Sequence, residues 1–248
     1  MPAELDGASP PPKQPAAEPG PVADRPSNEP PADLRLEDRL LRLLSAAEAA
    51  ELRETATAAA AWGAGSLVAL LGFEDERAVL SGTLYSQLFP SLTDAARRTE
   101  VSAADRERSE MTAACRAELE ARSLCAMATT IGVGGLLAAV ARACVGHGDA
   151  EAMVGCAMVL PAPRQVGTHP PASVAAQLFH EAPGRVLVAI PAARYADAML
   201  LTTSHGVPLL PLGRTGGREL VIRASDGGNS FREVLRLSAA ELFRHLRP

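Results

Sequence analysis

Apolar residues recur at helical spacing in the stretch 34–62. A first helix, capped by Asp33, places four leucines on one face: Leu36, Leu40, Leu43 and Leu44. The sequence Ser45-Ala-Ala-Glu48 has the capping-box pattern and predicts the start of a second helix running to about residue 61, which Gly63 and Gly65 end. The stretch 34–62 therefore predicts an αα-hairpin that packs either on the rest of the chain or on a second copy of it.

From residue 66 onward, short apolar runs alternate with helical stripes. Strands are predicted at 66–72, 124–131, 152–160, 185–190 and 207–212. Helices are predicted at 103–123, 134–145, 192–204 and 239–246, and a further short helix should end near residue 179. Ser102 and Ser238 are the predicted N-caps of the first and the last of these ranges. Gly216 and Gly217 predict a hairpin turn into a further strand at 219–223. This alternation, with its short connections, predicts one α/β or α+β sandwich over 63–248.

Composition changes this interpretation mainly at the N-terminus. Residues 1–33 hold ten of the 20 prolines, six acidic residues and two basic residues. Such a segment buries too little apolar surface to offset its chain entropy, so we expect a disordered, solvated tail. The net charge of −5 gives no electrostatic basis for binding nucleic acid.

Two uncharged segments, 55–73 and 123–141, have the length of a membrane span. Both are rich in alanine, threonine and glycine, which disfavours insertion, so no membrane association is expected. The four cysteines lack the spacing of a zinc site, and we expect buried free thiols in a reducing cytoplasm: Cys115, Cys125, Cys144 and Cys156.

The segment Thr129–Gly135 is the principal candidate site. An apolar strand leads there into an apolar helix opened by Gly134 and Gly135, and backbone N–H groups at such a helix start suit a phosphate or another anion. Magnesium would require carboxylate ligands, and no acidic residue occurs between Glu120 and Asp149. Two interpretations remain open: an anion cradle built from Thr129, Thr130, Gly132, Gly134 and Gly135, or a tight turn that only the fold requires.

Several motifs occur together in the order of a known family. They are Ser66–Gly72 followed by Leu80–Tyr85, the turn 129–135, Gln177–Val186, His205–Gly213 with Gly216–Ile222, and Ser238–Phe243. In this order they resemble the C-terminal, aminoimidazole-ribonucleotide-synthetase-like domain of phosphoribosylformylglycinamidine synthase. The resemblance implies the mixed sheet of that domain, and a relation to purine biosynthesis.

The departures from the family fall at the positions that carry its chemistry. Thr129 stands where the family has histidine, Thr130 and Val133 replace aspartates, Gly132 replaces serine, and Leu84 replaces glutamate. The residues that match the family mostly shape backbone or pack: Tyr85, Gly134, Gly135, Phe179, Glu181, Arg185, Gly206 and Gly213. In this family, ATP binding also requires a preceding domain, for which residues 1–62 offer only a tail and two helices.

Other candidate groups have simple structural alternatives. His180 and Glu181, together with Arg185, could act in acid–base chemistry. The favoured alternative is a simple ion pair between Glu181 and Arg185 beside a strand. Arg185 is also kept as a candidate anion ligand. Arg214, Arg218 and Arg223 could line one end of the sheet and attract phosphate, or form a solvated basic edge.

The sequence favours a non-catalytic relative of the synthase domain, a pseudoenzyme without cofactor or metal. It would act as a binding or interaction module, through self-association as a dimer or by pairing with a synthase-like protein. The alternative is a subunit of a working synthase that another chain completes, in which case ATP and Mg²⁺ take part. A third possibility is a module that shares only the fold and binds an unrelated anionic small molecule.

Overall fold

A computed structural model describes residues 38–39, 41–47, 62–73, 80, 83–89, 102–146, 151–162, 173–227 and 230–246. The predicted tail 1–33, Leu36, Leu40, and the predicted second helix from Glu48 to residue 61 lie outside the described residues. So do residues 163–172, which follow the strand predicted at 152–160.

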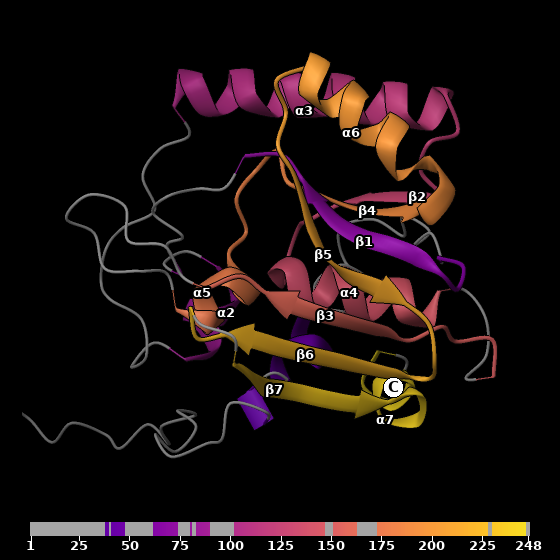
Figure 1. Ribbon diagram of the computed structural model, residues 1–248. Coiled ribbons are helices and arrows are strands. Elements are labelled where there is room, and N and C mark those ends of the chain that lie inside the picture. Colours follow the sequence, from indigo (N-terminus) through magenta and orange to yellow (C-terminus); the bar gives the residue numbers. More distant parts are fainter. Residues whose placement is uncertain are drawn as a thin grey trace, which may run out of the picture.

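Seven strands form one mixed sheet in the order β2-β4-β1-β5-β3-β6-β7 (Figure 1). Their bounds are β1 Ser66–Leu71, β2 Met127–Thr130, β3 Cys156–Leu160, β4 Val186–Pro191, β5 Leu209–Thr215, β6 Glu219–Ser225 and β7 Phe231–Ser238. The β3–β6 pair is parallel and the other neighbouring pairs are antiparallel. The predicted mixed sheet is thus confirmed.

Helices cover the sheet in two layers of unequal extent. Their bounds are α2 Leu84–Leu88, α3 Ala103–Ala121, α4 Gly135–Val145, α5 Val174–Phe179, the 3-10 turn η2 Ala192–Arg194, α6 Tyr195–Ser204 and α7 Ala239–Leu246. The larger core joins α4, α5 and α7 to one face of the sheet, which we call the inner face. A smaller core joins α3 and α6 to strands β2, β4 and β1 on the opposite, outer face. Ten of the 11 residues of helix α4 are buried, which fits a helix that is apolar on every side except at Arg142.

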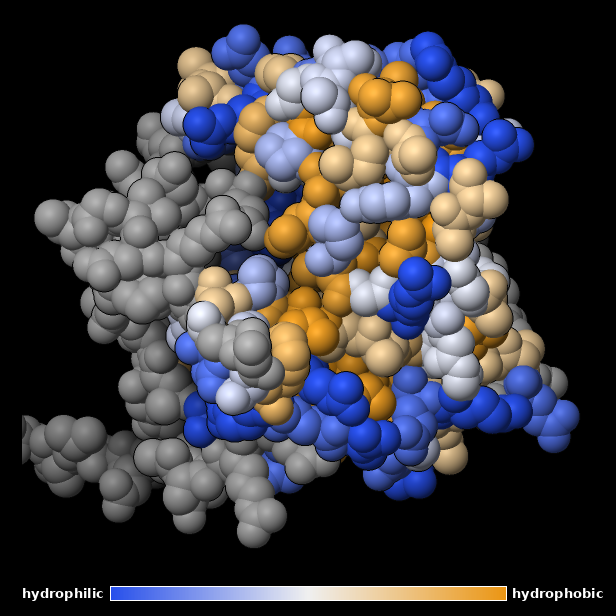
Figure 2. Space-filling view, in the orientation of Figure 1, coloured by the Kyte–Doolittle hydropathy of each residue, from blue (hydrophilic) through white to orange (hydrophobic). Residues whose placement is uncertain are grey.

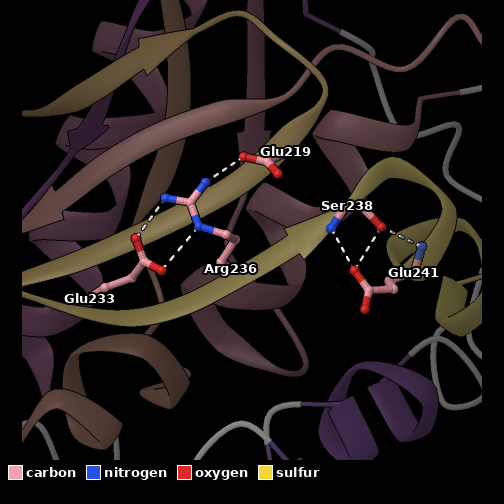
Figure 3. Close-up of polar contacts among 5 residues, drawn as sticks. All are labelled: Glu219, Glu233, Arg236, Ser238 and Glu241. Atoms are coloured by element: carbon pink, nitrogen blue, oxygen red, sulfur yellow. Dashed lines mark hydrogen bonds and ion pairs between the residues drawn. The ribbon is translucent and has the colours of Figure 1, made fainter.

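The predicted N-caps Ser102 and Ser238 are confirmed, and each is part of a capping box. The Ser102 hydroxyl accepts a hydrogen bond from the N–H of Asp105, whose carboxylate in turn accepts one from the N–H of Ser102. Ser238 and Glu241 make the same reciprocal pair at the start of α7, and Figure 3 shows both bonds. These local signals fix where α3 and α7 begin.

The predicted hairpin at Gly216–Gly217 is wrong, because β3 lies between β5 and β6. The N–H of Gly216 donates to the carbonyl of Gly155, and the N–H of Gly155 donates to the carbonyl of Gly217 (2.8 and 2.9 Å). A Cβ on Gly155 would lie 2.3 Å from the carbonyl oxygen of Glu219, so glycine lets the chain enter β3 between the two strands. The two glycines therefore make a crossing connection rather than a hairpin.

Strand β7 was not predicted from sequence. It forms a true hairpin with β6, with Val221 opposite Arg236. Its apolar alternation is short, because the inward residues Leu235 and Leu237 follow the charged run Arg232–Glu233. Pairing with β6 supplies the backbone hydrogen bonds that the weak pattern did not indicate.

The N-terminal helical residues also differ from prediction at one point. Helix continues through Ser45 to Ala47, and the Ser45 hydroxyl donates to the carbonyl of Leu41 (3.3 Å), so Ser45 does not start a second helix. Leu43, Leu44 and Ala47 are fully buried in the larger core. This helix therefore packs on the main region of its own chain, one of the two placements that the sequence left open.

Across the described ranges, no helix combines the length and the apolar character that crossing a membrane requires. The two uncharged segments contain strands and a helix of the domain instead. Residues 66–71 of the first form β1, and the second divides into β2 and most of α4.

Candidate functional site

The turn between β2 and α4 is tight and depends on glycine. The N–H of Gly135 donates to the carbonyl of Gly132 (3.0 Å), and Gly134 and Gly135 have φ values of +81° and +67°. Residues with a Cβ rarely adopt this left-handed conformation. The backbone conformation of this turn therefore favours glycine at both Gly134 and Gly135.

Neighbouring elements close tightly around this turn. A Cβ on Gly135 would lie 2.5 Å from the carbonyl oxygen of Leu178 at the end of α5. A Cβ on Gly134 would lie 2.7 Å from the Cβ of Ala47 and 3.4 Å from a methyl group of Leu43. Gly134 and Gly135 are both buried, whereas Gly132 is exposed. The helix that precedes the main region thus lies directly against the start of α4.

One carboxylate oxygen occupies the helix start. Oε1 of Glu181 accepts a hydrogen bond from the N–H of Gly134 (2.9 Å) and another from the N–H of Leu84, the first residue of α2 (3.0 Å). Both donors lie at helix starts, where a negative charge is stabilised. The N–H of Gly134, which the sequence suggested as an anion ligand, is already bound by an anion of the chain itself.

His180 and Arg185, the two predicted partners of Glu181, lie close to it in the sequence, between α5 and β4. Arg185 and His180 are 6% and 8% exposed, and Nη1 of Arg185 donates to the carbonyl oxygen of His180 (3.1 Å). The carbonyl of Arg185 accepts from the N–H of Ile131, which ties β4 to the turn (2.9 Å). The ion pair between Glu181 and Arg185 stays a prediction. So does the acid–base pair of His180 and Glu181.

Thr129 and Thr130 lie on the short edge strand β2. Thr129 is half-buried and Thr130 is exposed. Nη1 of Arg116, on α3, donates to the hydroxyl of Thr130 (3.1 Å), while its Nε is paired with Glu120 (3.0 Å). Arg116 was missed from sequence because its contact depends on how α3 packs beside β2.

Several positions that match the family are packing positions here. Tyr85 stacks on Phe179, with ring centroids 4.8 Å apart and planes 18° apart, and both rings are buried.

Within the residues that the structure describes, no three histidine, cysteine, aspartate or glutamate side chains lie close enough to hold a metal ion. The geometry of this region therefore supplies internal capping and packing.

The three arginines considered as a phosphate-binding edge do not converge. Arg214 lies on β5 and Arg223 on β6, with β3 between them, and both are exposed. Arg218 lies in the β5–β6 connection, where it donates to the carbonyl of Glu151 (3.4 Å).

The four thiols behave as predicted in one respect, because all are free. Cys115, Cys144 and Cys156 are buried and Cys125 is half-buried. Burial raises the pKa of Cys115 to about 11 and that of Cys156 to about 12. Burial, with a smaller effect of Glu120, also raises the pKa of Cys125.

Comparisons with known proteins identify the fold. No family model and no curated protein matches the sequence. Among solved structures, Thermotoga maritima PurL complexed with FGAR superimposes with a TM-score of 0.54 and 16% identity over 74% of this chain and 29% of that chain. PurL of the same organism complexed with ATP gives 0.52 and 15% over 74% and 26%. Phosphoribosylformylglycinamidine synthase II from Thermotoga maritima gives 0.51 and 17% over 74% and 27%.

These similarities confirm the resemblance predicted from sequence at the level of fold. The chain has the fold of one part of phosphoribosylformylglycinamidine synthase and spans between 26% and 29% of those three synthase chains. Identity of 15–17% carries the architecture and not the chemistry of the site.

Proposed function

We propose that this chain is a non-catalytic binding or interaction module that is built on a synthase-related fold. One observation carries the proposal: Glu181 binds the N–H of Gly134, while Leu43 and Ala47 pack against the same glycine. A nucleotide phosphate that approached this helix start would have to displace a carboxylate and separate buried apolar contacts. The cost of both steps opposes binding.

The residues at the turn support the same conclusion. Thr130 and Val133 occupy positions where the resemblance places aspartates, and neither side chain can replace an anionic ligand of Mg²⁺. The hydroxyl of Thr130 is engaged by Arg116. We therefore propose a role without cofactor or metal, in the cytoplasm, with a second copy of the chain or a synthase-like protein as partner.

Calorimetric titration of the full chain with ATP·Mg²⁺ tests this proposal. We expect no saturable heat at millimolar nucleotide, and no ATP- and glutamine-dependent conversion of formylglycinamide ribonucleotide. A negative result counts only if the protein is folded. Cooperative unfolding of the same sample is therefore the control. Saturable binding of magnesium nucleotide that Gly134→Val abolishes in a folded protein would refute the proposal.

A second candidate function rests on the coverage of the structural matches. Because the chain corresponds to little more than a quarter of the synthase, another polypeptide could supply the remaining parts of a working enzyme. ATP and Mg²⁺ would then bind mainly to that polypeptide. Deletion of the gene should in that case create a purine requirement. Growth of the deletion strain without purines would exclude this alternative.

A further inference from the structure

The two faces of the sheet differ in what the described residues place on them. On the outer face, Figure 2 shows apolar side chains over β5 and β3, bordered by a charged belt over β6 and β7, and no described helix lies over these strands. The inner face carries the helix formed by residues 38–39 and 41–47, which lies behind the sheet in Figure 1, in indigo. We call these residues the strap helix. On the inner face, therefore, the occupant of the surface is itself part of the structure.

The strap helix is amphipathic, and its apolar side faces the core. Leu43, Leu44 and Ala47 are fully buried, whereas Arg42 and Ser45 are exposed. Positions 43, 44 and 47 share one side of a helix, because residues three and four apart are neighbours on its surface. An amphipathic helix that lies in an apolar groove binds in this way.

Small residues at the start of α4 let the strap helix approach closely. A Cβ on Gly134 would lie 2.7 Å from the Cβ of Ala47 and 2.7 Å from that of Ala138, one turn further along α4. Because Gly134 has no side chain, Ala47 fits at this crossing, and a larger side chain in its place would collide with α4. The surface under the strap helix therefore suits a helix that presents two adjacent leucines and, four residues after the first, an alanine.

Side chains, and not the backbone, attach the strap helix to the domain. In the described part of the chain, residues 41–47 make no backbone hydrogen bond to another element. The Ser45 hydroxyl lies 3.3 Å from Nδ1 of His245 on α7, at an exposed position where water competes for both groups. Burial of the two leucines and the alanine is thus the main attachment.

The surface under the strap helix is held by contacts in which the strap helix takes no part. At the start of α4, Oε1 of Glu181 accepts a hydrogen bond from the N–H of Gly134 (2.9 Å). Near its end, the carbonyl of Cys144 accepts one from the N–H of Val154, which ties α4 to the segment before β3 (3.1 Å). Helix α4 therefore keeps its position when the strap helix leaves.

The chain beyond the strap helix is anchored separately. Trp62 is buried, and its Nε1 donates to the carbonyl of Val154 (3.0 Å). Residues 48–61 separate Trp62 from Ala47, and a segment of that length spans about 45 Å when it is extended. Release of the strap helix therefore does not require Trp62 to move.

We propose that the strap helix is a releasable cover of a helix-binding surface at the start of α4. While it is docked, it closes this surface to other helices. When it leaves, the surface binds an amphipathic partner helix that carries the same leucine pair and the same alanine. This inference names a partner class for the proposed interaction role and rests on that role for its biological meaning. Helix binding is measured without nucleotide, so either proposal can fail while the other stands.

Hydrogen exchange of the full native chain tests the release. We expect the amides of residues 41–47 to exchange through a local opening, with protection factors at least about tenfold below those of residues 138–145 in α4. Equal protection of the two helices would show that the strap helix leaves only when the domain unfolds, and would overturn the proposal.

A labelled peptide with the sequence of residues 34–47 tests the surface. In the full chain with Leu43→Asp and Leu44→Asp, the strap helix would have to bury two carboxylates, so the surface is left open. Fluorescence anisotropy should give a dissociation constant for the peptide at least about tenfold lower with this double variant than with the native chain. Arg42→Asp is the matched control, because it adds a carboxylate on the exposed side of the strap helix, and it should bind the peptide as the native chain does.

The peptide also tests the size limit at Gly134. A peptide with Ala47→Leu should bind the double variant at least about tenfold more weakly, whereas Ser45→Ala, at an exposed position, should change little. Circular dichroism and cooperative unfolding verify that each chain is folded, and Leu44→Ala replaces the double variant if that variant does not fold. A folded variant that binds the peptide no better than the native chain, or that accepts the Ala47→Leu peptide equally well, would refute the proposal.

Discussion

Glu181 and Gly134 are joined by a hydrogen bond of 2.9 Å between a carboxylate oxygen and the backbone N–H at the start of α4, across 47 positions of sequence. The same oxygen accepts from Leu84, 97 positions away, at the start of α2. Glu181 therefore connects two helix starts that no local signal relates. The properties of the candidate site follow from this link.

Replacing Glu181 should separate the effect of its charge from that of its hydrogen bonds. Glu181→Ala leaves two partly buried backbone donors without this acceptor, and we expect a loss of about 1–3 kcal/mol in the free energy of unfolding. Glu181→Gln retains an acceptor oxygen and should lose less, because only the interaction of the charge with the helix starts is removed. Urea unfolding measures both values.

The control for this pair is Glu107→Ala, which removes an exposed glutamate from α3. Its effect should remain within about 0.5 kcal/mol of zero. Equal stability of Glu181→Ala and Glu107→Ala would show that the carboxylate does not hold the two helix starts in solution.

Gly135 should tolerate no side chain. Alanine there must adopt a positive φ and place its Cβ 2.5 Å from a backbone oxygen of α5, so we expect a destabilisation above about 2 kcal/mol. Gly63→Ala is the matched control, because Gly63 is exposed and no atom lies within 4 Å of the added Cβ. Thermal unfolding compares the two variants. A Gly135→Ala protein as stable as the Gly63→Ala control would contradict the described geometry of the turn.

The contact between α3 and α6 should make stability depend on acid pH. Nε2 of His205 and Oε2 of Glu118 are 2.6 Å apart; this hydrogen bond, aided by Arg122, lowers the pKa of Glu118. A carboxyl with a lowered folded pKa stabilises the protein above its unfolded pKa of about 4.3, and this stabilisation is lost as the pH falls through the folded value. Native protein and Glu118→Gln should therefore differ at neutral pH and converge in acid.

Urea unfolding midpoints measured at steps from about pH 7 downward into acid, well below the unfolded pKa of about 4.3, follow this convergence. Glu107→Gln, on the same helix, should differ little from the native protein at both pH values. A gap between the native protein and Glu118→Gln that stays constant into acid would show that the His205 contact does not lower the pKa of Glu118.

Thiol reactivity should follow burial. Burial raises the pKa of all four thiols, but Cys125 is half-buried whereas Cys115, Cys144 and Cys156 are buried. A disulfide-exchange reagent must reach the sulfur, so Cys125 should be the first to react in the native protein, and all four should react in denaturant. In Cys125→Ser, the fast phase should disappear. Rapid modification of a second thiol in that folded variant would contradict the burial of the core cysteines.

Local sequence signals identified most elements because their causes are local. The capping boxes at Ser102 and Ser238 act within one helical turn, and the apolar stretch of α4 remains apolar in any packing. The turn at Gly134–Gly135 was recognisable because a positive φ favours glycine. These features do not depend on which segment lies next to them.

What the sequence determined by itself was therefore the order of most strands and helices, their caps, and the absence of carboxylates from the turn 129–135. Only the tertiary structure placed β3 between β5 and β6, formed β7 by pairing, and brought Glu181 and the helix of Leu43 onto Gly134. The physical reason is that strand order and the partner of a carboxylate depend on contacts between distant segments. Those contacts are selected by the packing of the whole domain, and local periodicity carries little information about them.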